Sequence, residues 1–279
     1  MLLAVALLLA LGLGGCSTTR LLYANADWLV YQALDNRFGV RPDQEDWIRA
    51  SIDSLHGRHR VTELPAYRES IEELSVRFAD GLDAADLVWL DRRFERHRRA
   101  LVELAVPQLA RFLADLDKDQ LARFVEVSGE DIDDAAEPLA WSRARRQAHR
   151  FDTFVDRIEV WTGELSVSQL RELRVEVAAL SDIRREWIDH RRQRLRTLAD
   201  LLRSDPDRAS IATALYHWWG NTDQGYRPTF AAQVKLLKEQ IFNLVLRLDS
   251  RLTRRQREHV LDRLQGYISN IDIVVAARE

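Results

Sequence analysis

Three histidines are the residues whose chemistry could matter most, because an imidazole can bind a metal ion or change charge near neutral pH. His59, His97 and His190 each follow apolar residues at helical spacing, and each is followed directly by an arginine. If their helices converge, the three rings form a metal site or a pH sensor. The simpler interpretation is that each ring fills an interior position and hydrogen-bonds to a neighbour, because helical spacing fixes a face and not a meeting point. We therefore predict no metal site and no cofactor.

Other signatures of catalysis are missing from the sequence. There is no Gly-x-Ser-x-Gly, no His-Glu-x-x-His and no glycine-rich phosphate loop. The chain has a single cysteine, Cys16, so a catalytic thiol elsewhere is excluded. We assign no catalytic residue and expect a protein that is not an enzyme. A metal-dependent hydrolase that uses the histidines is the minor alternative.

Aromatic residues gather on both sides of residues 220–225, which the sequence predicts to be a loop. Trp218 and Trp219 are consecutive, so one helix cannot bury both on a single narrow stripe. Together with Tyr226 and Phe230 they form the candidate binding surface. The alternative is a plug of core residues that closes one end of the fold, because large aromatic side chains usually end up mostly buried.

The first residues of the chain carry its clearest targeting signal. The apolar run Leu2–Leu13 is ~12 residues long, and at 1.5 Å per residue it falls short of the ~30 Å hydrocarbon core of a bilayer. Residues 1–15 are therefore predicted to be a signal peptide and not a membrane span. No basic residue precedes the apolar run, which departs from the usual signal pattern.

The end of this run, Leu13-Gly14-Gly15-Cys16, resembles a bacterial lipobox. The resemblance implies cleavage before Cys16, lipidation of Cys16, and a membrane as the partner reached through that anchor. Ser17 resembles the residue that sorts lipoproteins to the outer membrane, so the implied location is the periplasmic side of that membrane. Residues 16–22 are then a short lipidated tether that reaches ~20 Å when extended, and residues 23–279 are a single helical domain.

The chain after the tether resembles a known group of proteins. Tyr23-x-Asn25-x-Asp27-Trp28 and the later turn Trp161-Thr162-Gly163 are similar to an uncharacterised family of helical proteobacterial lipoproteins, known only as a domain of unknown function. The resemblance implies a helical lipoprotein and brings no activity with it.

A helix-start phrase, Leu-[Ser/Thr/Asp]-x-x-[Gln/Asp], begins at Leu82, Leu116, Leu165 and Leu252, with a degenerate copy at Val40–Gln44. The second residue can cap a helix, and the fifth can accept a hydrogen bond from the amide of the capping residue, which makes a capping box. The phrase also resembles the Leu-Thr-x-x-Gln repeats of Spy/CpxP-type periplasmic chaperones, although capping chemistry alone produces the same letters. The resemblance implies a small helical protein that binds clients as a chaperone does. Capping chemistry alone implies only that helices start at these positions.

The predicted fold class is all-α, a bundle of long amphipathic helices with no sheet, because apolar residues recur at helical spacing between these starts. One helix is predicted from Val167 to Arg203. Pro65, Pro107 and Pro138 should kink or restart their helices. Turns are predicted at 204–207 and 220–225.

Composition limits the range of functions. A net charge of −3 leaves no broad basic surface for nucleic acid. We expect a non-enzymatic, protein-binding role in the cell envelope, in its sharper form a chaperone-like handling of envelope proteins. The alternative is a structural scaffold with one fixed partner.

Overall fold

The computed structural model describes residues 16–220 and 226–277, and within them it confirms the all-α fold, since every element there is helical. The first five helices are α2 (Cys16–Ala24), α3 (Ala26–Phe38), α4 (Pro42–Ala79), α5 (Ala84–Ala114) and α6 (Lys118–Ala136). After the 3-10 helix η1 (Glu137–Ala140) come α7 (Arg143–Thr162), α8 (Val167–Ala179) and α9 (Arg184–Arg203). The last three are α10 (Arg208–Gly220), α11 (Pro228–Asp249) and α12 (Arg254–Ala276). The predicted signal peptide and residues 221–225 of the predicted loop lie outside the described residues.

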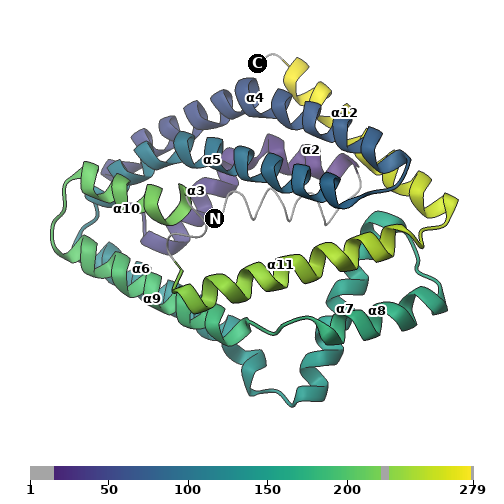
Figure 1. Ribbon diagram of the computed structural model, residues 1–279. Coiled ribbons are helices and arrows are strands. Elements are labelled where there is room, and N and C mark those ends of the chain that lie inside the picture. Colours follow the sequence, from purple (N-terminus) through teal and green to yellow (C-terminus); the bar gives the residue numbers. More distant parts are fainter. Residues whose placement is uncertain (1–15, 221–225, 278–279) are drawn as a thin grey trace.

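The helices form a three-sided arrangement (Figure 1). The long helix α4 packs against both α5 and α12, and α10 packs against α5. A second side is the pair α6 and α9, and the third is α11 together with α7 and α8. Helix α2 packs against α12 and α3. No helix in the described part of the chain is both long and apolar enough to cross a bilayer.

The apolar stripes are buried in three separate clusters. The largest lies where α3, α4, α5, α6 and α10 meet, and its Phe38 ring stacks on Phe124 at 4.9 Å and meets the edge of Phe112 at 5.0 Å. The second joins α7, α8 and α11 around Leu173. The third joins the end of α4 to α12 around Phe78. Burial is thus concentrated where helices meet, which leaves stretches of the long helices partly exposed between the clusters.

The predicted capping boxes are confirmed at all four complete helix-start phrases. The N-cap side chains of Asp83, Asp117, Ser166 and Thr253 each accept from the amide three residues on, and the residue at that position accepts from the N-cap amide. In the degenerate copy the Arg41 amide donates to Gln44 Oε1 at 3.1 Å, and Pro42 is the first helical residue. These five helices therefore begin where local hydrogen-bonding chemistry places them.

Glutamines of these helix starts pair across the structure. Gln120 Nε2 donates to Gln44 Oε1 at 2.8 Å, and Gln44 Nε2 donates to Gln120 Oε1 at 3.3 Å. The pair Gln169 and Gln256 repeats this arrangement at 2.9 and 3.1 Å. Each Nε2 also donates to the backbone carbonyl two residues before the N-cap of its partner helix: Gly39, Asp115, Arg251 and Glu164. Both amide hydrogens of each glutamine have acceptors, so these buried side chains lock two pairs of helix starts together.

The single helix predicted from Val167 to Arg203 is wrong. The chain leaves the helix after Ala179, and α9 begins only at Arg184. Side chains distant in the sequence satisfy the free backbone groups of the break: Arg150 donates to the carbonyls of Leu180 and Ser181 at 2.9 and 2.8 Å. The Ser181 amide donates to Gln240 Oε1 at 2.9 Å. The turn predicted at 204–207 is confirmed between α9 and α10.

The predicted helix restart occurs at one of the three prolines. Pro65 and Pro107 lie inside α4 and α5, which do not restart there, whereas Pro138 follows the end of α6 and lies in η1. A proline inside a helix costs about 3 kcal/mol. The buried neighbours Leu64 and Val106, at 5% and 0% exposure, provide packing that offsets this cost.

Residues 16–22 are not an extended tether, because they belong to α2. The helical hydrogen bonding continues almost without a break into α3: the Asn25 amide donates to the Leu21 carbonyl at 3.2 Å, and the Leu29 amide donates to the Asn25 carbonyl at 3.0 Å. A contact to α4 through Tyr23 holds α2 against the body, as described next.

Candidate functional site

A row of polar aromatic side chains lies between α2, α4 and α5. Tyr23 of α2 contacts His56 and His59 of α4, with ring centroids 4.6 and 5.8 Å apart. His59 contacts Tyr67 at 5.5 Å, and Tyr67 meets His97 of α5 edge-on at 4.7 Å. We call these five residues the Tyr–His row. It brings together two of the three histidines that the sequence singled out, and it links the first described helix to the body.

Helical spacing places the α4 members on one face. His59 follows His56 by three residues, and Tyr67 and Ser70 continue the same side of the helix after two further turns. Two hydrogen bonds join this face to its neighbours. Tyr23 OH bonds His59 Nδ1 at 3.1 Å, and Ser70 Oγ bonds His97 Nε2 at 2.9 Å. The row is therefore a set of specific polar contacts between three helices.

Burial sets the protonation states in the row. His59 is 8% exposed, and its burial lowers the pKa of the imidazole to about 4, assisted by the nearby His56. Burial also lowers the pKa values of His56 and His97, and it raises the pKa values of the Tyr23 and Tyr67 hydroxyls. All five groups are neutral at pH 7.

An active site lowers the pKa of its nucleophile. The pKa values of the Tyr23 and Tyr67 hydroxyls are raised instead, so neither hydroxyl is an activated nucleophile. The row also contains polar atoms that lack a hydrogen-bond partner in the described structure: His56 Nε2, His59 Nε2 and the Tyr67 hydroxyl. Neutral groups of this kind can hold a water molecule or respond to acid, because a proton added to His59 has no carboxylate in the row to stabilise it. The arrangement suits attachment of α2 to the body better than covalent chemistry.

The third predicted histidine lies elsewhere. His190 of α9 packs against Tyr226 at 4.7 Å and Phe230 at 5.4 Å, and these two rings contact each other at 4.8 Å. The three histidines thus do not meet. Within the described residues, no three side chains of His, Cys, Asp or Glu are grouped so that they could hold a metal ion.

The structure divides the predicted aromatic surface into two parts. Trp218 and Trp219 of α10 are partly buried and pack on the largest cluster, and Arg98 donates to the Trp219 carbonyl. Tyr226 is partly buried, and Phe230 is only 4% exposed. Phe230 is therefore an interior residue rather than part of an accessible surface. The packing of all four agrees with the alternative use as core residues.

A charged groove of about 550 Å³ runs along α5 and was not predicted. Its lining residues are Asp91, Arg92, Glu95, Arg96, Arg99, Ala100 and Glu103. Two large apolar side chains on the same helix, Leu90 and Phe94, are 38% and 43% exposed. Lys238 of α11 forms an ion pair with Asp91 at 2.5 Å. Acids and arginines three or four residues apart were the sequence signal for this face, but a solvated helix surface gives the same signal.

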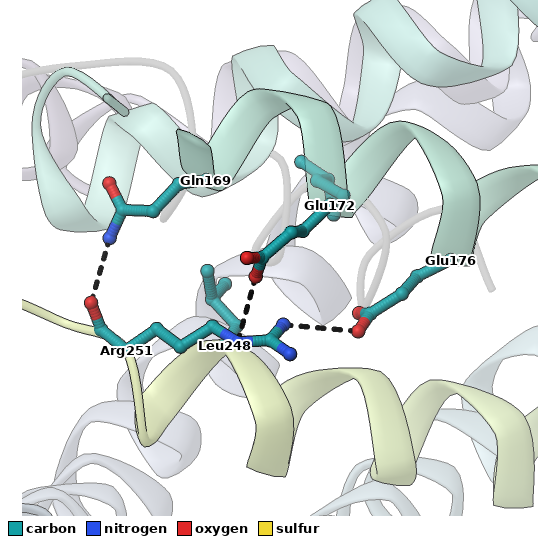
Figure 2. A pocket seen from close by; sticks show the side chains of 6 residues that line it. Gln169, Glu172, Glu176, Leu248 and Arg251 are labelled. Atoms are coloured by element: carbon teal, nitrogen blue, oxygen red, sulfur yellow. Dashed lines mark hydrogen bonds and ion pairs between the residues drawn. The ribbon is translucent and has the colours of Figure 1, made fainter. Parts of the chain in front are cut away.

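A second hollow is too small for a ligand. Figure 2 shows Arg251 between Glu172 and Glu176 of α8, with ion pairs of 2.8 and 3.2 Å. Gln169 donates to the Arg251 carbonyl at the edge of the same crevice. The crevice has a volume of about 10 Å³, which leaves room for little more than one water molecule. This crevice is a packed junction between α8 and the turn before α12.

Comparison with known proteins identifies a family. A family of unknown function, DUF6279, matches residues 38–227. No curated protein and no solved structure matches the chain. The matched range includes the α5 groove and every member of the Tyr–His row except Tyr23.

Proposed function

The chain belongs to this family of unknown function, and we propose that it is a lipid-anchored envelope protein that binds other proteins and has no catalytic role. The anchor is Cys16, at the end of the lipobox-like sequence. The protein faces the periplasm from the outer membrane. The observation that carries the binding role is the α5 groove.

The groove has the chemistry of a protein interface. Its lining acids and arginines surround the small side chain of Ala100, and charged and polar groups of this kind form the rim of protein interfaces. The groove is lined along one helix and contains both signs of charge. A small-molecule site is normally a concave, mostly apolar cavity with few polar groups. A partner protein that presents complementary charges fits this face better.

Photo-crosslinking in intact cells tests the proposal. The photoreactive residue p-benzoylphenylalanine replaces Arg96, an exposed residue in the groove, and in a matched control it replaces Arg171, an exposed arginine on α8. We expect covalent adducts with envelope proteins from position 96 and none from position 171. The same adducts from both positions, or none from either, would contradict a binding role for the groove.

The adducts also distinguish two forms of the proposed function. Many different envelope proteins would support chaperone-like handling of clients. One protein in constant proportion would support a scaffold with a fixed partner. In both forms the charged side chains of the groove contact the partner, so the charge reversal Arg99→Glu should reduce the adduct yield from position 96 in either case.

A further inference from the structure

We propose that the outer side of α2 and the start of α3 docks on the surface of the phospholipid bilayer. The docking face consists of Leu21, Trp28 and Leu29. This inference rests on the proposed anchor at Cys16 and adds to it a defined orientation of the body. The observation that motivates it is a group of large apolar side chains that the fold leaves exposed next to the anchor.

The three side chains share one side of an almost continuous helix. Leu21, Trp28 and Leu29 are 65%, 55% and 39% exposed. Leu21 and Trp28 are seven residues apart, close to two helical turns, so they point in similar directions, and Leu29 widens the face by about 100° around the helix axis. Ala24, between them on the same side, is also exposed. The face is thus a stripe that no described part of the chain covers.

Other side chains of the same two helices are fixed to the body. Tyr23 bonds His59 and packs on His56 in the Tyr–His row. Tyr31 is 7% exposed in the largest cluster, with the Arg49 guanidinium 3.7 Å from its ring centroid. The exposed stripe therefore has a definite orientation relative to the rest of the molecule and cannot simply turn inward.

The anchor brings this stripe to the bilayer. Helix α2 begins at Cys16, so Leu21 lies ~7.5 Å and Trp28 ~18 Å along the helix from the proposed lipidation site, at 1.5 Å per residue. Acyl chains on Cys16 enter the bilayer at the beginning of this helix. With a helix in place of an extended tether, the stripe stays within reach of the lipid surface.

The chemistry of the stripe fits the interface between lipid and water. Tryptophan is enriched at that depth, and leucine side chains add apolar area that the acyl boundary can cover. Arg20 is exposed beside Leu21 and can meet lipid phosphates. A bilayer surface explains an aromatic, an aliphatic and a basic residue at one end of the chain, next to a lipidated cysteine.

Quenching of tryptophan fluorescence by brominated lipids tests the docking face. The mature chain from Cys16 retains every residue that the structure describes, and Cys16 is its only cysteine. Its thiol can be coupled to a maleimide lipid in phosphatidylethanolamine and phosphatidylglycerol vesicles, which fixes the attachment point without cellular lipidation. We compare the wild type with Trp28→Phe and with the control Trp187→Phe, which removes an exposed tryptophan on α9.

We expect brominated acyl chains to quench the emission of about one of the eight tryptophans. This quenching should disappear in Trp28→Phe and persist in Trp187→Phe. Equal quenching in the wild type and Trp28→Phe would overturn the docking face, even if Cys16 is lipidated in cells. Quenching that depends on Trp28 would uphold the docking face, even if Cys16 is found unmodified in cells and the proposed anchor fails.

Discussion

Acid should weaken the fold through His59. The pKa of the buried imidazole is about 4, below its ordinary value of 6.5, so the unfolded chain binds a proton over a pH range in which the folded chain does not. Stability is then fully present above the unfolded pKa of 6.5. It falls as the pH drops toward 4, and the loss is complete below that value. From these two values, lowering the pH from ~7.5 to ~5 removes about 2 kcal/mol of unfolding free energy.

Urea denaturation of the wild type and His59→Gln at both pH values measures this contribution. Glutamine can still bond the Tyr23 hydroxyl but does not titrate. The pH-dependent part of the unfolding free energy should shrink by about 2 kcal/mol in the variant. Some pH dependence should remain, because burial also lowers the pKa values of His56 and His97. His259→Gln, on the exposed side of α12, is the control.

The reasoning would be refuted if the wild type and His59→Gln lost the same free energy between the two pH values. Such a result would mean that His59 is solvated or paired in the folded protein. It would also contradict the lowered pKa of His59 in the Tyr–His row, but it would not contradict the ring contacts of the row. A decrease of the pH dependence in the His259→Gln control would show that the effect is not specific to the row.

Three further predictions concern the caps, the tryptophan pair and metal binding. Ser166→Ala should lower the unfolding free energy by about 1 kcal/mol, because it removes the cap of α8; an unchanged urea midpoint would contradict the cap. Trp219→Ala should cost about 3 kcal/mol, because Trp219 packs on the largest cluster; an unchanged thermal midpoint would instead return Trp219 to the candidate binding surface. Protein purified without a histidine tag should contain no stoichiometric zinc, iron or copper by elemental analysis, because His190 lies apart from His59 and His97; one equivalent that disappears in His97→Ala would favour a metalloenzyme.

The features that the sequence predicted correctly are local. Each capping box needs only a short side chain and an acceptor three residues later, so Ser166 and Gln169 were sufficient to place the start of α8. Apolar residues at helical spacing also indicated buried faces, and Leu173 and Val177 of α8 are buried as such spacing requires. The all-α fold follows from such stripes and from the scarcity of sequence patterns that predict strands.

The features that the sequence did not reveal depend on contacts between distant residues. The break after Ala179 has only a weak local signal, Ser181-Asp182, in which Asp182 accepts from the Arg184 amide at 3.2 Å. The distant residues Arg150 and Gln240 supply the other hydrogen bonds that make the break stable. The pairing of Gln169 with Gln256 joins positions 87 residues apart. A capping box predicts that a glutamine serves its own helix, but not which other helix it meets.

The candidate site was predictable only in part. The stripes indicated interior positions for His59 and His97, and His59 is buried. Their connection through Tyr67, and the contact of Tyr23 with α4, could not be inferred because helical spacing does not show which helices pack together. The sequence signal for this site was the spacing of His56, His59 and Tyr67, which places them on one helical face. That spacing indicates a contact site only once α2 is known to be a helix that packs against this face.

The central claim is that the body is held at a membrane through Cys16, and the mass of the mature N-terminus tests it most directly. Full-length protein is expressed in a bacterial host, extracted from the membrane fraction with detergent, and digested for mass spectrometry of the N-terminal peptide. The account predicts a peptide that begins at Cys16 and carries a diacylglyceryl group and an N-linked acyl chain, and Cys16→Ala should give neither the cleavage nor the acyl mass. An N-terminal peptide with an unmodified Cys16, or cleavage that is unaffected in Cys16→Ala, would contradict it.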